Sequence, residues 1–211
     1  MAIAQTTTIF FSAIIIVLFS SSIVAHTSGD VGGMPKATDF MTAACKNASA
    51  NCDEEIHITE KFCVSTLRAD NRSHKAKDLR DLALIGVDIL KARVVTANGK
   101  VQEMLHDAKK GTSMARHLTV CKLVYEATVT FTNVCTTLLK DYRGPNGGDN
   151  DGPASDDLPE CVEHVNTLIG YCGYDILHKS GLHALFNENR EMSRLAYLNI
   201  ALLGPYRHNN S

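Results

Sequence analysis

Residues 114–140 of this chain, MARHLTVCKLVYEATVTFTNVCTTLLK, decide its fold. Apolar and small side chains recur here at three- and four-residue steps, which is the spacing of one helix face. The members of this stripe are Leu118, Cys121, Tyr125, Thr128, Phe131, Thr132, Cys135, Leu138 and Leu139. The stretch therefore predicts one long amphipathic helix, with Tyr125 and Phe131 packed in the core.

The same period recurs in three further stretches, residues 73–108, 158–177 and 188–203. Asn98 and Gly99 predict a break or kink in the first of them, and a short Lys109–Thr112 turn joins it to residue 114. Short joints make antiparallel neighbours. Together with helical pieces at 39–48 and 59–69, the pattern predicts an all-α, disulfide-stapled fold: an up-down-up-down four-helix bundle with an N-terminal helical hairpin.

The ends of the chain predict secretion. Ile9 to Phe19 form an apolar run of the length of a signal h-region, so residues 1–25 are expected to be a signal peptide. Residues 26–38 are expected to be a flexible lead-in, 39–205 one helical domain and 206–211 a C-terminal tail. No later run is long enough to cross a bilayer, so no membrane contact is expected after cleavage.

The charge balance excludes one class of partner. The formal net charge is −2 at pH 7, and nothing in it argues for a polyanionic partner. Nucleic acid is therefore not an expected partner. Nine histidines predict instead that binding to a protein partner depends on pH between 5 and 7.5.

Seven cysteines behind a signal peptide predict a disulfide framework. If Cys121 bonds Cys172 across antiparallel helices, Cys135 lies about 21 Å further along one helix and Cys161 about 16 Å back along the other. Cys135 and Cys161 then lie on nearly the same helix faces as Cys121 and Cys172. The difference of about 5 Å between the two steps is comparable with the Cα–Cα distance of a disulfide. The helix geometry therefore predicts two rungs, Cys121 with Cys172 and Cys135 with Cys161.

Three cysteines remain, and a bond among them would close the hairpin. We expect Cys45 to pair with Cys63, although a bond between Cys52 and Cys63 stays open. With the first pairing, Cys52 is left as a thiol or as an intermolecular link that would form a dimer. Zinc is not expected, because neither Cys-x2-Cys nor His-Glu-x2-His occurs.

No catalytic or cofactor motif stands out. There is no Gly-x-Ser-x-Gly elbow, and residues 178–183 are expected to form a surface loop. Residues 141–157 place Asp149 and Asp151 at calcium-loop spacing, but Pro153 and Ala154 occupy positions that need a ligand and a glycine, so a solvated linker is expected. Sequons at Asn47 and Asn71 predict glycosylation on exposed surface.

Three groups of residues carry a resemblance to a known family. Phe62-Cys63-Val64-Ser65-Thr66-Leu67-Arg68-Ala69-Asp70, Cys121-x3-Tyr125-x-Ala127 and the position of Cys172 resemble motifs of the plant invertase and pectin methylesterase inhibitors. The resemblance covers about residues 44–203. It implies a secreted hairpin and bundle, with one disulfide closing each.

The resemblance implies inhibition rather than catalysis: a rigid bundle would cover the cleft of a cell-wall enzyme in a one-to-one complex in the apoplast. Pectin methylesterase is the expected target, with acid invertase as the alternative. His164, Val165 and Tyr171 depart from the family pattern before Cys172, which leaves a non-inhibitory binding bundle open. A secreted hydrolase is the third class considered.

Overall fold

The computed structural model of the chain describes residues 37–50, 52, 58–144 and 154–207. All regular elements within these residues are helices, so the all-α prediction is confirmed. The expected signal peptide (1–25), the lead-in as far as residue 36, the loop at 145–153 and residues 208–211 of the tail lie outside the described residues.

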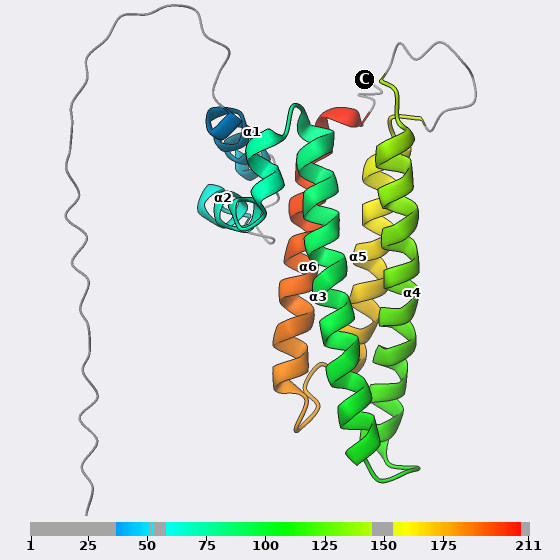
Figure 1. The fold of residues 1–211 in the computed structure, drawn as a ribbon. Helices are drawn as coiled ribbons and strands as arrows, with labels where there is room; N and C mark the ends of the chain where they lie inside the picture. Colours follow the sequence, from blue (N-terminus) through cyan, green and yellow to red (C-terminus); the bar gives the residue numbers. More distant parts are fainter. Residues whose placement is uncertain (1–36, 51, 53–57, 145–153, 208–211) are drawn as a thin grey trace, which may run out of the picture. The chain divides into compact units, whose positions relative to one another are not determined.

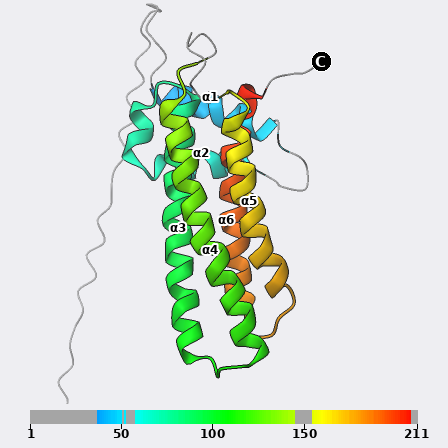
Figure 2. The ribbon, with the colours of Figure 1, turned by 90° about the vertical axis from the view of Figure 1, so that its right-hand side faces the viewer.

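Four long helices form the bundle: α3 (Leu79–Asp107), α4 (Ser113–Asp141), α5 (Asp157–Ile176) and α6 (His183–Leu202). Each helix packs on the next, and α6 returns to pack on α3. Successive helices run in opposite directions in both views (Figure 1, Figure 2). The arrangement is the up-down-up-down bundle that the periodicity predicts.

Local caps set where the helices begin. The Asp78 carboxylate accepts a hydrogen bond from the backbone N–H of Asp81 at 2.8 Å, and the Thr112 hydroxyl accepts one from Ala115 at 3.2 Å. The first bundle helix therefore begins at residue 79 rather than 73, and residues before it form the short 3-10 helix η2 (Asn71–Lys75).

The predicted break at Asn98 and Gly99 is wrong, because α3 continues through both residues. Gly99 is exposed, with no neighbouring atom within 4 Å of an added Cβ, so it costs only the helix propensity of one glycine, about 1 kcal/mol. Val94, Ala97 and Val101 are fully buried on either side of it. Their packing holds the helix together across the glycine.

The N-terminal hairpin consists of α1 (Ala37–Ala50) and α2 (Glu60–Arg68), joined by a disulfide between Cys45 and Cys63. Its apolar side packs against α3 and α6 in a hydrophobic cluster separate from the core between the four bundle helices. This cluster contains Met41, Ala44, Cys45, Ala48, Ile58, Cys63, Leu67, Ala76, Leu82, Ile85, Leu198 and Leu202. The hairpin is thus held by packing on the bundle as well as by its disulfide.

Two further disulfides join α4 to α5. Cys121 is bonded to Cys172 with a Cα–Cα distance of 4.7 Å, and Cys135 to Cys161 with 5.6 Å. The Cys121–Cys172 bond lies against a buried polar contact, in which the Tyr125 hydroxyl donates to Asn189 Oδ1 at 3.0 Å. The same pair of helices is therefore cross-linked at two levels about 21 Å apart.

Candidate protein-docking surface on helices α4 and α5

Large apolar side chains exposed to solvent are concentrated on α4 and α5. Within the described residues seven such side chains are exposed, and six of them lie on these two helices. The six are Val120, Leu123, Phe131, Val134, Tyr171 and Tyr174. Leu123 and Tyr171 are each 60% exposed and Tyr174 is 83% exposed. The seventh, Val95, lies on α3.

Helix geometry explains why the four α4 residues share one side. At about 100° per residue, positions 120, 123, 131 and 134 fall within a sector about 80° wide, which faces away from the core stripe. Their Cα atoms span about 21 Å along the helix. The expectation that Phe131 packs in the core is therefore wrong, since its side chain is 41% exposed and belongs to this outer stripe.

Two kinds of contact continue this surface onto α5. The Phe131 ring lies 6.4 Å from the ring of His164, and the disulfides hold α5 beside α4. Tyr171 lies two turns beyond His164, and Tyr174 lies one turn further. We call the surface formed by Val120, Leu123, Phe131, Val134, His164, Tyr171 and Tyr174 the α4–α5 face.

Threonines flank the apolar residues of the α4–α5 face, and their hydroxyl groups are engaged with the backbone of their own helices. The hydroxyls of Thr119, Thr130 and Thr137 on α4 donate to carbonyl oxygens four residues back, at 2.7–3.2 Å, and Thr167 on α5 does the same at 3.0 Å. A hydroxyl engaged with its own helix is less available to water, and the methyl group remains. The threonines therefore extend the apolar area.

Charged groups are sparse on α4 between Arg116 and Lys140. Over this length the helix carries one ion pair, Lys122 to Glu126 at 3.6 Å, and His117. Protein interfaces have centres that are depleted of charge and enriched in Tyr and Phe, and contiguous exposed apolar patches mark such sites. The composition of the α4–α5 face is that of an interface centre rather than of a solvated helix.

The glycosylation sequons lie on α1 and η2, outside the helices that form the α4–α5 face. Asn47 is exposed on α1, and Asn71 is exposed at the start of η2. The hydroxyl of Ser73, the third residue of the second sequon, is buried and donates to the carbonyl of Leu67 at 2.6 Å. Glycans at either asparagine would begin outside the α4–α5 face. Cys52 is partly exposed between α1 and α2, and a dimer through it stays a prediction.

A Ser-His-Asp arrangement joins α4 to α5 at one end of this surface. His117 Nε2 lies 3.0 Å from Ser113 Oγ, and His117 Nδ1 lies 2.8 Å from Asp175 Oδ2. Sequence spacing does not indicate this arrangement, because Asp175 is 58 residues away from His117. Ser113 is exposed, and none of the three residues lines either of the two cavities described below, so the contact serves to tie the start of α4 to the end of α5.

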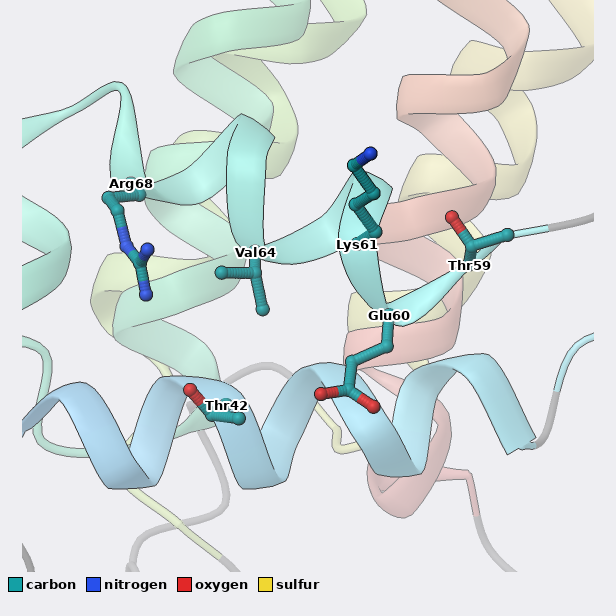
Figure 3. A pocket seen from close by; sticks show the side chains of 6 residues that line it. All are labelled: Thr42, Thr59, Glu60, Lys61, Val64 and Arg68. Atoms are coloured by element: carbon teal, nitrogen blue, oxygen red, sulfur yellow. The ribbon is translucent and has the colours of Figure 1, made fainter.

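Two cavities lie at the hairpin. One, of about 510 Å³, lies between α1 and α2 (Figure 3) and is lined by Thr42, Thr59, Glu60, Lys61, Val64 and Arg68. The other, of about 340 Å³, lies where α2 meets α3 and α6 and is lined by Phe62, Thr66, Ala69, Asp70, Ile89, Arg93 and Leu195. Neither includes a residue of the α4–α5 face.

Residues of metal-binding type do not gather anywhere in the described part of the chain in a group of three or more. Asp149 and Asp151, the residues at calcium-loop spacing, lie outside the described residues, and Asp157 at the end of the same segment accepts a hydrogen bond from the backbone N–H of Ala154 at 2.8 Å. Among the helices that the structure describes, none is long and apolar enough to cross a bilayer.

Comparison with known protein families gives one match. The model of the family described as Plant invertase/pectin methylesterase inhibitor matches residues 39–198, which is more than half of the chain. The match includes the hairpin and nearly all of the four bundle helices. A comparison with curated proteins finds no significant match.

Proposed function

Because this chain belongs to the plant invertase/pectin methylesterase inhibitor family, we propose that it is a secreted inhibitor of a pectin methylesterase. Members of this family are inhibitors and not enzymes. In this proposal the protein acts in the apoplast, binds one enzyme molecule and blocks the entrance to its active-site cleft. The observation that carries the proposal is the charge-poor α4–α5 face, with its exposed tyrosines and Phe131.

The size of the face suits the centre of such a complex. Its length of about 21 Å and a width of two helices, each about 10 Å across, give an area of about 400 Å². A stable one-to-one complex covers about 800 Å² on each partner. The α4–α5 face thus accounts for the dry centre of an interface, and polar residues around it would form the rim.

Rigidity supports the same role. Both disulfides between α4 and α5 lie within the helices that carry the exposed side chains, so their backbones are held in place before a partner arrives. A preorganised surface loses less conformational entropy on binding, which improves affinity. Exposed aromatic side chains on such a base are the residues that most often dominate binding energy.

The first experiment titrates a plant pectin methylesterase and a plant acid invertase with the oxidised protein at pH 5 and pH 7. Stoichiometric loss of methyl ester hydrolysis supports the proposal, and loss of sucrose cleavage would assign the alternative target instead. If neither activity falls at a twofold molar excess, the proposed function is wrong and a non-inhibitory binding bundle takes its place.

A matched pair of variants then tests the surface. Leu123→Asp places a charge within the α4–α5 face, where Leu123 is 60% exposed, and Val95→Asp makes the matched change on α3, where Val95 is 51% exposed. A charge buried without a partner at an interface centre costs about 2 kcal/mol or more, so the inhibition constant should rise at least about 30-fold for Leu123→Asp. Val95→Asp should leave it unchanged. Equal inhibition by both variants would place the contact elsewhere.

A further inference from the structure

One end of the bundle gathers cationic and histidine side chains from α3, α4, α6 and the two loops that connect the helices there. The end of α3, the start of α4, the end of α5 and the start of α6 all lie at this end, opposite the hairpin (Figure 1, Figure 2). Contacts join three of these segments: His117 on α4 lies against Asp175 on α5, and a Cβ added to Gly181, in the loop before α6, would lie 3.1 Å from Met114 Cε. We call residues 103–117 and 175–183 the turn end.

The cations of the turn end are exposed and available. Lys109, Lys110, Arg116 and Lys179 are all exposed, and within the described residues none of them makes an ion pair. The carboxylates here are fewer and mostly engaged. Asp107 lies 3.1 Å from His106, and Asp175 lies 2.8 Å from His117. Four cationic side chains without an ion pair are therefore exposed at the turn end. Glu103 is the one carboxylate of the turn end that makes no contact of this kind in the described residues.

Histidines make the charge of this end depend on pH. Four of the nine histidines of the chain lie here, namely His106, His117, His178 and His183. Four Lys and Arg against three Asp and Glu give the turn end a formal charge of +1 with its histidines neutral. Histidine is the side chain whose charge changes between pH 5 and 8.

The groups that face these histidines come from every element at this end. They are Glu103 and Asp107 on α3, Lys109 and Lys110 in the turn, Ser113 and Arg116 on α4, Asp175 on α5, and Lys179 in the loop before α6. Acid therefore adds positive charge to a region that already has a cationic excess, so affinity for an anion should increase as pH falls.

We propose that the turn end binds a polyuronate, a linear polysaccharide that carries one carboxylate on each sugar. The choice of this polyanion rests on the proposed function, because hydrolysis of methyl esters in pectin leaves such a chain. A hydrated polymer also fits the surface better than a lipid bilayer does. Within the described residues of the turn end no large apolar side chain is exposed, and peripheral membrane contacts usually require one.

Binding at this end would hold the inhibitor on the product of its target enzyme. Lys109, Lys110 and Lys179 differ from the residues of the α4–α5 face, so the two surfaces can be tested separately. Cations spread over several elements suit a long flexible polyanion, which contacts many of them at once and whose binding weakens with salt.

The test measures binding of the oxidised protein to immobilised polygalacturonate, at pH 5 and pH 7.5, in 20 mM and 500 mM NaCl. Fully methyl-esterified pectin and vesicles with anionic phospholipid are the comparison ligands. We expect binding to polygalacturonate that is at least about tenfold tighter at pH 5 than at pH 7.5 and is lost in high salt. Binding to the esterified polymer should be absent.

Two triple variants locate the site. Replacement of Lys109, Lys110 and Lys179 by serine should weaken binding to polygalacturonate at least about tenfold. The matched control replaces Lys46, Lys75 and Lys77, which are exposed on the hairpin segment, and should leave binding unchanged. Equal losses in both variants, no binding at pH 5 in low salt, or equal binding to esterified pectin or to the vesicles would overturn the proposal.

Enzyme inhibition, measured in parallel, separates this proposal from the proposed function. The turn-end variant should still inhibit pectin methylesterase acting on a short methyl-esterified oligomer. If the wild type fails to inhibit any enzyme yet binds polygalacturonate through the turn end, the site stands and the inhibitor role falls. If the wild type inhibits the enzyme but does not bind polygalacturonate, the inhibitor role stands and the polyuronate site is wrong.

Discussion

Replacing Gly173 by alanine tests the buried contact between α5 and α6. A Cβ at this position would lie 2.4 Å from Nδ2 of Asn189, which is closer than real Cβ atoms come to other heavy atoms. Asn189 is buried and cannot simply turn away, because its Oδ1 accepts the hydrogen bond of the Tyr125 hydroxyl at 3.0 Å. Tyr125 is fully buried, so no water can replace the amide.

The magnitude follows from three contributions. Inserting a methyl group into a packed core costs about 1 to 3 kcal/mol. Loss of the buried hydrogen bond adds about 1 to 3 kcal/mol, and the better helix propensity of alanine returns about 1 kcal/mol. The net free energy of unfolding should therefore fall by about 3 kcal/mol, which lowers the melting temperature by about 6 to 12 °C for a domain of this size.

Gly170 supplies the matched control on the same helix. It is exposed, and an added Cβ meets nothing within 4 Å. Gly170→Ala should therefore raise the free energy of unfolding by about 0.5 to 1 kcal/mol. Both variants are measured by urea unfolding of the oxidised protein, followed by circular dichroism at 222 nm. A Gly173→Ala variant as stable as Gly170→Ala would refute the reasoning.

A double-mutant cycle locates the effect. Asn189→Ala alone removes the partner of the Tyr125 hydroxyl and should be destabilising, but it also removes the amide that a Cβ at residue 173 would meet. The two substitutions together should therefore cost less than the sum of the single changes, by about 1 kcal/mol or more. Additive losses would mean that the clash involves other atoms.

Three further predictions concern the rest of the chain. Burial raises the pKa of the Tyr125 hydroxyl above its ordinary value of about 10. Its contribution to the free energy of unfolding is therefore fully present below about pH 10 and is lost as pH rises above that value. Tyr125→Phe should be less stable at pH 7 but should lose less between pH 9 and 11 in urea unfolding; equal pH slopes would contradict this. Replacing Cys135 and Cys161 by serine should lower the free energy of unfolding by about 3 kcal/mol, because the disulfide closes a loop of 26 residues in the unfolded chain. Peptide mapping of the wild-type protein without reductant should find Cys135 and Cys161 in one linked fragment. Peptide N-glycosidase F should reduce the mass of the secreted protein by two glycans, and Asn47→Gln and Asn71→Gln should each remove one; an unchanged mass would leave the sequons unmodified.

The fold could be predicted because its signals are local. In α4 the spacing of Leu118, Tyr125, Thr132 and Leu139 indicates one buried face, and all four side chains are buried in the structure. The start of α6 was harder to predict. The helix begins at His183, five residues before the predicted start, with no side-chain cap to mark it. Leu185 is buried there, but its packing partners are distant in sequence.

The α4–α5 face could not be predicted from the same pattern. A periodic pattern indicates one apolar stripe on a helix, but α4 carries two, so the pattern predicts the wrong stripe for Phe131. Val120, Leu123 and Val134 were available as a signal, because they are apolar residues that do not fit the core spacing. Which stripe faces solvent depends on where α3 and α5 pack, and that is a property of the whole bundle.

The position of the two disulfides argues for their role in binding. α3 packs on α4 and α6 packs on α3 without a disulfide in the described residues, whereas α4 and α5 are joined by two. Both rungs join the two helices that carry six of the seven large apolar side chains exposed in the described residues. An exposed apolar surface is a liability in a secreted protein unless a partner covers it. A cross-linked base that keeps this surface in one shape reduces the entropy lost on covering it, so removal of the Cys135–Cys161 rung should weaken inhibition even where the variant remains folded.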